Sequence, residues 1–79
     1  MRIETKLKAL QAVADGRVTR TYYGSGSRIR GGGTSAAVLW RLVSDGFIED
    51  GDGHPSFLNT YKMKLTGTGV KTLAGSASD

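Results

Sequence analysis

Cysteine is absent from this chain of 79 residues. Without a thiol the chain cannot hold a disulfide framework, a thiolate zinc site, an iron–sulfur cluster or a redox switch, and a reducing compartment suits it. Long apolar runs are missing too: no stretch has the length of a membrane-spanning helix, and residues 1–10 alternate in charge where a signal peptide needs an apolar core. These absences predict a cytoplasmic protein that does not enter the membrane.

Groups suited to catalysis are scarce. His54 is the only histidine and lies in a loop with glycine and proline, and the acidic residues Asp50 and Asp52 have no second acidic site to oppose them. A metal site built from these three residues would lack the usual ligand spacings. We therefore expect no enzyme activity, no metal, no cofactor and no small-molecule effector.

The composition is that of a small globular domain. Hydrophobic residues make up 38% of the chain, and two Phe, three Tyr and one Trp can anchor a core. A domain of this size buries only about 60% of the surface of its unfolded chain, so little room remains for a pocket. We expect one domain over residues 1–75 and a frayed tail over residues 76–79.

The charge of +4 is unevenly distributed along the sequence. Residues 16–44 contain five arginines and no acidic residue, whereas residues 45–53 contain four acidic residues and no basic one. A basic segment of this kind creates a local positive potential that attracts a polyanion. Simple solubility is the alternative explanation.

A helix is predicted over residues 2–15. Its apolar residues recur at helical spacing and line one face, which consists of Ile3, Leu7, Leu10 and Val13 or Ala14. Gly16 can adopt the left-handed conformation that ends a helix.

The next residues, 17–33, are rich in β-branched and aromatic residues and then in glycine. Val18–Tyr23 has the composition of a strand. Two alternatives stay open for the glycine-rich part: residues 27–30 form the second strand of a hairpin, or residues 25–30 form one helical turn. The three glycines at 31–33 lack the lysine and the preceding apolar strand of a phosphate-binding loop, so a flexible hinge is favoured.

A second helix is predicted over residues 35–45. Thr34 or Ser35 can cap its first turn with a side-chain oxygen, and Gly46 can end it. Its buried stripe consists of Val38, Leu39 and Leu42. A short strand over residues 47–49 follows and needs a partner strand.

That partner is Thr60–Leu65, in which Tyr61, Met63 and Leu65 alternate with polar residues. The polar loop between the two strands predicts a hairpin with an extended tip. A short helix capped by Thr66 or Thr68 follows. Its inward-facing residues are expected to be Val70, Leu73 and Ala74.

The order of these elements resembles that of a winged helix-turn-helix domain. The residues that carry the resemblance are Leu42, Gly46, Phe47 and Ile48 after the second helix, and Met63, Leu65, Thr66, Gly69 and Leu73 after the wing. The match covers residues 34–73. Residues 22–33 depart from the pattern, which usually has a well-formed helix there. The resemblance implies an α+β winged-helix fold and a small bacterial or phage DNA-binding regulator.

The resemblance also implies that residues 35–45 are a recognition helix whose N-terminal end enters the major groove of double-stranded DNA. Residues expected to contact the DNA are Thr34, Ser35, Ala37 and Arg41 at this helix, Arg28 and Arg30 in the basic segment, and His54, Ser56, Lys62 and Lys64 in the wing. Solvated surface is the alternative for the helix residues and for Arg28 and Arg30. The wing tip is acidic at Asp50 and Asp52, so the wing either stands off the DNA or meets a protein. One winged helix reads few base pairs, so a homodimer or a protein partner is expected.

The expected function is sequence-specific or architectural DNA binding, in transcription regulation or as a phage-type control or recombination accessory protein. The alternative keeps the fold but makes it a protein-interaction module, which the change of charge sign near Asp45 favours. Candidate partner contacts are then Trp40, Tyr22, Tyr23 and the acidic wing. Trp40 also lies next to the buried Leu39, and packing against a neighbouring strand is its favoured interpretation.

Overall fold

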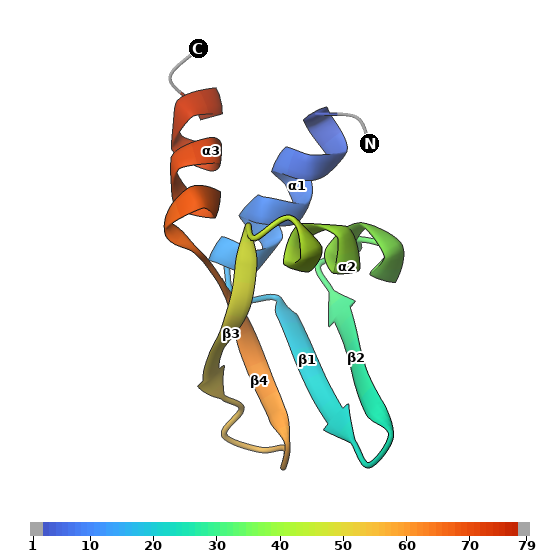
Figure 1. Cartoon of the computed structure of the whole chain (residues 1–79). Helices are drawn as coiled ribbons and strands as arrows, with labels where there is room; N and C mark the ends of the chain where they lie inside the picture. Colours follow the sequence, from blue (N-terminus) through green and yellow to red (C-terminus); the bar gives the residue numbers. More distant parts are fainter. Residues whose placement is uncertain (1–2, 78–79) are drawn as a thin grey trace.

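Helices and paired strands alternate along the chain (Figure 1). The structure is a computed structural model that describes residues 3–77. Its elements are α1 (Ile3–Ala14), β1 (Val18–Tyr23), β2 (Gly26–Gly31), α2 (Ala36–Ser44), β3 (Ile48–Gly53), β4 (Thr60–Leu65) and α3 (Gly67–Ala77). Within this described range the fold is α+β, with three helices and one four-stranded antiparallel sheet, and none of the helices combines the length and the apolar character needed to cross a membrane.

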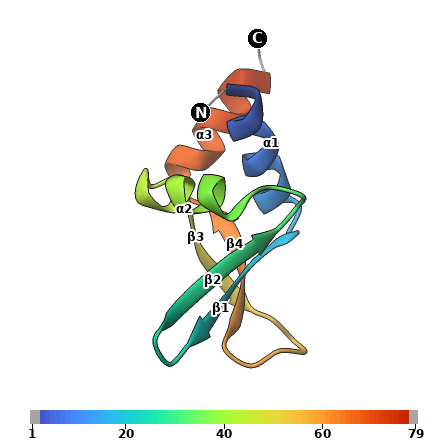
Figure 2. The same ribbon diagram turned by 90° about the vertical axis from the view of Figure 1, so that its right-hand side faces the viewer.

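The sheet has the strand order β2-β1-β4-β3 and consists of two hairpins joined side by side. The β1–β2 hairpin is regular along its whole length, whereas β1 and β4 pair only where Thr19–Thr21 meet Thr60–Lys62. Beyond this short ladder the two hairpin tips separate (Figure 2). The sheet is therefore anchored to the helices at one end, and its other end extends away from them (Figure 1).

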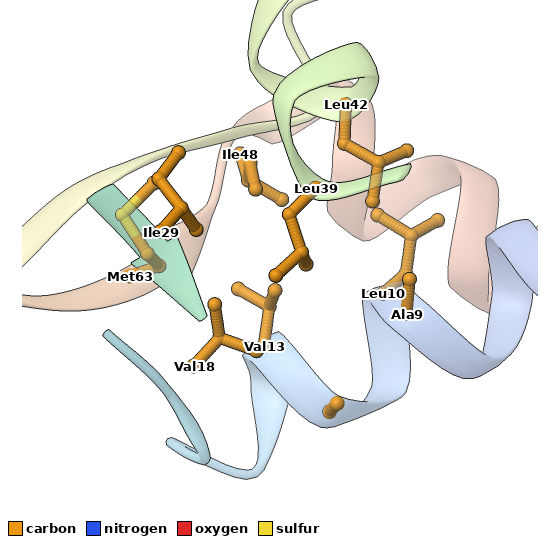
Figure 3. Packing of buried hydrophobic residues seen from close by; sticks show 10 residues of the cluster. Ala9, Leu10, Val13, Val18, Ile29, Leu39, Leu42, Ile48 and Met63 are labelled. Carbon is orange, nitrogen blue, oxygen red and sulfur yellow. The ribbon is translucent and has the colours of Figure 1, made fainter. Parts of the chain in front are cut away.

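The core lies where α1 and α2 meet the anchored end of the sheet (Figure 3). Each of the four strands and each of these two helices contributes to it. The buried apolar residues are Ala9, Leu10, Ala12, Val13, Val18, Ile29, Leu39, Leu42, Ile48 and Met63. Burial of side chains of this size stabilises a fold by about 1.5–3 kcal/mol each, so a few residues hold the small domain together.

The expected apolar face of α1 is only partly correct. Leu10 and Val13 are buried, but Ile3 is 58% exposed and Ala14 is exposed as well. Ala9 and Ala12 are buried in their place. Ile3 is exposed because α2 and the sheet cover only the C-terminal half of α1, whose N-terminal half extends past the sheet (Figure 1).

The glycine-rich segment forms a strand, so the hairpin alternative holds and the helical turn is wrong. Gly31, at the end of this strand, and Gly32 after it are packed against neighbouring residues and do not form a free hinge, whereas Gly33 meets nothing within 4 Å. A Cβ atom on Gly31 would lie 2.1 Å from the carbonyl oxygen of Arg17, and one on Gly32 would lie 2.5 Å from the Cβ of Ala12. All three glycines have positive φ angles, which non-glycine residues rarely adopt. The turn thus presses β2 and α2 against the end of α1.

Specific caps define the ends of α2. The Oγ of Ser35, rather than that of Thr34, accepts a hydrogen bond from the backbone N–H of Val38. At the other end Gly46 has a φ of 78°, and the N–H of Phe47 donates to the carbonyl oxygen of Leu42. This pattern is a Schellman motif, and it turns the chain directly into β3.

The strand after α2 is longer than residues 47–49. β3 continues through Asp50 to Gly53 because its backbone pairs with β4, although Asp and Gly are poor strand formers. The pairing shifts between Asp50 and Gly53, and a Cβ on Gly51 would lie 2.6 Å from the carbonyl oxygen of Lys62. The acidic residues expected in a loop therefore belong to an irregular edge strand.

Thr66 fastens the start of α3 to the end of α2. Its Oγ1 accepts from the N–H of Gly69 and donates to the carbonyl oxygen of Gly46, and its own N–H donates to the carbonyl oxygen of Phe47. Thr66 is therefore the cap of α3, and Thr68 is not. The expected inward face is correct only for Leu73, because Val70 is 52% exposed and Ala74 is exposed too.

Gly69→Ala should destabilise the fold because its Cβ would lie 2.1 Å from the carbonyl oxygen of Phe47. Overpacking of this kind costs about 1–3 kcal/mol of unfolding free energy. The matched control is Gly75→Ala in the same helix, where a Cβ meets nothing within 4 Å. Alanine there should stabilise by about 0.5–1 kcal/mol. Urea denaturation followed by circular dichroism measures both, and equal effects of the two substitutions would contradict this packing.

Candidate nucleic-acid interface

The strand register decides which residues lie on each side of the sheet. Side chains alternate along a strand, and residues paired across antiparallel strands point to the same side. Arg20 is paired with Ile29 and Tyr61, and its guanidinium contacts Trp40, so this side faces α2. The opposite side, here called the open face, carries Thr19, Thr21, Tyr23, Arg28, Arg30, Glu49, Thr60, Lys62 and Lys64.

The residues expected to bind DNA fall into two groups on opposite sides of the sheet. The first group, here called the helix surface, lies at α2 and consists of Thr34, Ser35, Ala37 and Arg41. The second group lies on the open face or in the loop beside it, and consists of Arg28, Arg30, His54, Ser56, Lys62 and Lys64. In Figure 2 α2 and the loop between β3 and β4 extend to opposite sides of the molecule. The structure therefore brings these residues together in two surfaces instead of one.

The helix surface is small and only weakly basic. Ser35, Ala36 and Ala37 are exposed and offer little side-chain bulk, so another molecule can approach the first turn of α2 closely. Arg41 is the basic residue of α2, and its Nε lies 3.5 Å from Oδ2 of Asp45. Both side chains are well exposed, at 66% and 44%. Such a pair contributes about 0–1 kcal/mol, so Arg41 can exchange Asp45 for a bound anion at little cost.

On the side that faces α2, Arg20 forms the centre of a polar and aromatic cluster. Its Nη1 lies 3.7 Å from Oδ1 of Asp50, and its Nε–H donates to the Oγ of Ser27. The guanidinium carbon lies 4.8 Å from the ring centre of Tyr22 and 5.0 Å from that of Trp40. Arg20 is therefore held inside the fold, and sequence reasoning missed this role because it had counted Arg20 simply as one of five arginines in the basic segment.

This cluster also accounts for two of the candidate partner contacts. Trp40 is half-buried against the core and Arg20, as its favoured interpretation predicted. The hydroxyl of Tyr22 donates to Asp50, and its ring packs edge-on against Tyr61. Neither side chain is free to form a docking surface, whereas Tyr23 on the open face is 57% exposed.

Ion pairs neutralise most of the acidic residues. The four pairs are Asp15 with Arg17, Asp50 with Arg20, Asp45 with Arg41 and Glu49 with Lys64. Within residues 3–77, Arg28, Arg30 and Lys62 form no ion pair, and all three belong to the open face. The acidic segment is thus compensated except at Asp52. Of the cations without an ion pair in the described residues, Arg28, Arg30 and Lys62 lie together on one side of the sheet, whereas Lys6, Lys8 and Lys71 lie on α1 and α3.

A hollow of about 320 Å³ lies on the open face between the strands and the β3–β4 loop. Thr19, Thr21 and Thr60 form its floor, and Tyr23, Arg30, His54, Phe57 and Leu58 surround them. The ring of His54 tilts against that of Phe57 with 4.7 Å between the ring centres. Phe57 is 63% exposed and Leu58 is 92% exposed. Sequence reasoning missed both residues, although two adjacent apolar residues in an otherwise polar loop were the available signal.

A second hollow, of about 430 Å³, lies at the other end of the open face, beside the C-terminal turn of α1. Asp52, for which no ion pair occurs within residues 3–77, lines it together with Lys62, Lys64 and Val70. In the same range no three His, Cys, Asp or Glu side chains gather in a group that could hold a metal ion. The hollow near Phe57 combines the rings of Tyr23, His54 and Phe57 with the cation of Arg30.

The substitution Tyr22→Phe should lower the free energy of unfolding at neutral pH, and the loss should be smaller at high pH. The hydrogen bond to Asp50, then burial and the charge of Asp50, raise the pKa of the Tyr22 hydroxyl above 10.0. The folded state therefore favours the protonated phenol, and this stabilisation is present below pH 10 and lost as the pH rises through the folded pKa. Urea denaturation of both proteins between about pH 8 and pH 11 measures the difference.

Tyr23→Phe is the matched control, because it removes an exposed tyrosine hydroxyl on the other side of the sheet. Its effect on the unfolding free energy should stay small across the range. A constant difference between the wild type and Tyr22→Phe from neutral to alkaline pH would contradict the raised pKa.

Comparison of the chain with protein-family models, with curated proteins and with solved structures finds no match. Function must therefore be inferred from the two surfaces themselves. The open face presents cations to the solvent, and the helix surface presents the N-terminal end of α2. Four of the acidic residues form ion pairs with cations of the same fold.

Proposed function

We propose that the protein binds double-stranded DNA as a winged-helix domain, with the N-terminal end of α2 in the major groove. In this proposal α2 is the recognition helix, and the β3–β4 hairpin is the wing. The strand order β1-β4-β3 beside α1 and α2 supports it, because the β1 strand of a winged helix pairs with the second strand of the wing. β2 takes the position in the chain where the first helix of a helix-turn-helix pair would be.

The observation that carries the proposal is the character of the exposed surface of α2. Its first turn combines the positive end of the helix dipole with the small side chains of Ser35, Ala36 and Ala37, and Arg41 follows one turn later. The positive end of a helix attracts phosphate, and small side chains let the helix enter a groove about 12 Å wide. Arginine forms bidentate hydrogen bonds with guanine.

The size of α2 limits what such a contact can recognise. Nine residues make a helix about 13 Å long, which spans roughly four base pairs at about 3.4 Å each. Specific recognition of a natural site needs more base pairs than this, so a homodimer or a partner bound to the adjacent DNA completes the site. Such an assembly would act in transcription regulation or as an architectural accessory protein.

The open face lies away from the DNA in this arrangement. Arg28, Arg30 and Lys62 then attract DNA at a distance without contacting the groove occupied by α2. A protein-docking function through Trp40, Tyr22 or Asp50 has less support, because these side chains contact one another or Arg20 inside the fold.

Arg41→Gln and Ala37→Glu should each weaken binding to a labelled duplex by about tenfold or more. Loss of one good base contact costs about 1–3 kcal/mol, and a new carboxylate in the groove would repel phosphate. Fluorescence anisotropy at several salt concentrations measures the affinity. Wild-type affinity should fall steeply with salt, because neutralised phosphates release counterions.

The matched control is Lys71→Gln, which removes one positive charge from α3 without touching the helix surface. It should change duplex affinity by less than about twofold. If Lys71→Gln weakened binding as much as Arg41→Gln, general charge attraction would replace recognition by α2.

A further inference from the structure

We propose that the open face is a second binding site, for single-stranded nucleic acid, whose bases stack on Tyr23 and Phe57 while its backbone follows Arg28, Arg30 and Lys62. This site lies on the opposite side of the sheet from α2, so it does not depend on the duplex contact proposed above.

The charge of the open face matches a nucleic-acid backbone. Arg28 and Arg30 alternate with the buried Ile29 along the edge strand β2, so both point to the open face, and Lys62 lies on the same side two strands away. None of the three has an ion pair with a carboxylate within the described residues. Of the acidic residues at this face, Glu49 is paired with Lys64, and Asp52 lies at the second hollow, away from Tyr23 and Phe57. Cations in a row across a sheet can contact successive charges of one chain, so they suit a polyanion and not a single charged group.

The exposed aromatic rings favour a ligand whose bases are unpaired, because only such bases have free faces for stacking. Tyr23 ends β1 and Phe57 projects from the loop, and both line the hollow while remaining more than half exposed. Exposed rings beside cations are the usual platform on which successive bases stack in proteins that bind single strands. In a duplex the faces of the bases are stacked on their neighbours, so Tyr23 and Phe57 would find nothing to contact.

The hollow itself limits the mode of binding. Its volume of about 320 Å³ lies at the lower end of the range of roughly 300–1,000 Å³ for small-molecule sites. The threonine floor is already partly used, since the hydroxyls of Thr21 and Thr60 are hydrogen-bonded to each other. The hollow therefore suits one planar base inserted beside Phe57, with Thr19 and Arg30 making polar contacts to the edge of the base. So few polar contacts give only a weak sequence preference.

The test is anisotropy of a labelled oligothymidylate of roughly 12 nucleotides, within the site size of about 4–16 nucleotides for small single-strand binding domains. Phe57→Leu keeps the apolar surface and removes the ring, so affinity should fall about tenfold. Ile3→Ala is the control at an exposed apolar position on α1 that does not line the hollow, and its effect should stay below about twofold. Arg28→Gln with Arg30→Gln should weaken binding and reduce its salt dependence.

Further arms separate this site from the duplex contact and from a protein partner. Ala37→Glu should leave oligothymidylate binding unchanged, which distinguishes failure of the open face from failure of α2. No binding of oligothymidylate at low salt would overturn the proposal, whatever the duplex result. Equal affinity of the wild type and Phe57→Leu for oligothymidylate would also overturn it. Displacement of the oligonucleotide by polyglutamate at the same concentration of charge would do the same. Either result would mean that charge alone holds the ligand.

Discussion

The fold depends on Arg20, because this side chain links β1 to β3 and α2, whose backbones do not pair with β1, and adds a side-chain contact to the neighbouring β2. From β1 it reaches Asp50 on β3 across the intervening β4, Ser27 on β2 and the ring of Trp40 on α2. The charged atoms are largely withdrawn from water, with 20% and 33% of the Arg20 and Asp50 side chains exposed. Removing either partner would leave the other partly buried without compensation, so this pair holds the two hairpins in one orientation beyond their short ladder.

The same contact decides how charge is distributed on the surface. Along the sequence a basic segment is followed by an acidic one, but folding brings the two together so that Arg20 meets Asp50 and Arg41 meets Asp45. What remains without an ion pair on the sheet is the row formed by Arg28, Arg30 and Lys62. The net charge of +4 therefore understates the positive character of the open face and overstates that of the side facing α2.

Local patterns were sufficient to predict α1, β1, α2 and β4 and to narrow the N-caps of α2 and α3 to two residues each, because periodicity and hydrogen-bonding side chains are properties of short segments. Only the structure selects Ser35 over Thr34 and Thr66 over Thr68. They could not predict how far a neighbour covers a helix, so Ile3 and Val70 were expected inside and lie outside. They also could not settle β2 or the length of β3, which depend on pairing with a distant strand. The candidate site shows the same limit: the sequence proposed its residues as DNA contacts on one surface, but only the register reveals that they occupy two sides of a sheet.

The glycines at the end of β2 affect how sequence conservation among homologues of this chain should be interpreted. Gly31 and Gly32 have no room for any side chain, and they touch neither of the proposed binding surfaces. In a set of homologous chains these two positions would stay constant while the residues of the open face changed with the ligand. Strict conservation at residues 31 and 32 would therefore reflect packing of the fold. Differences in ligand binding would be reflected in the more variable positions around Tyr23 and Phe57.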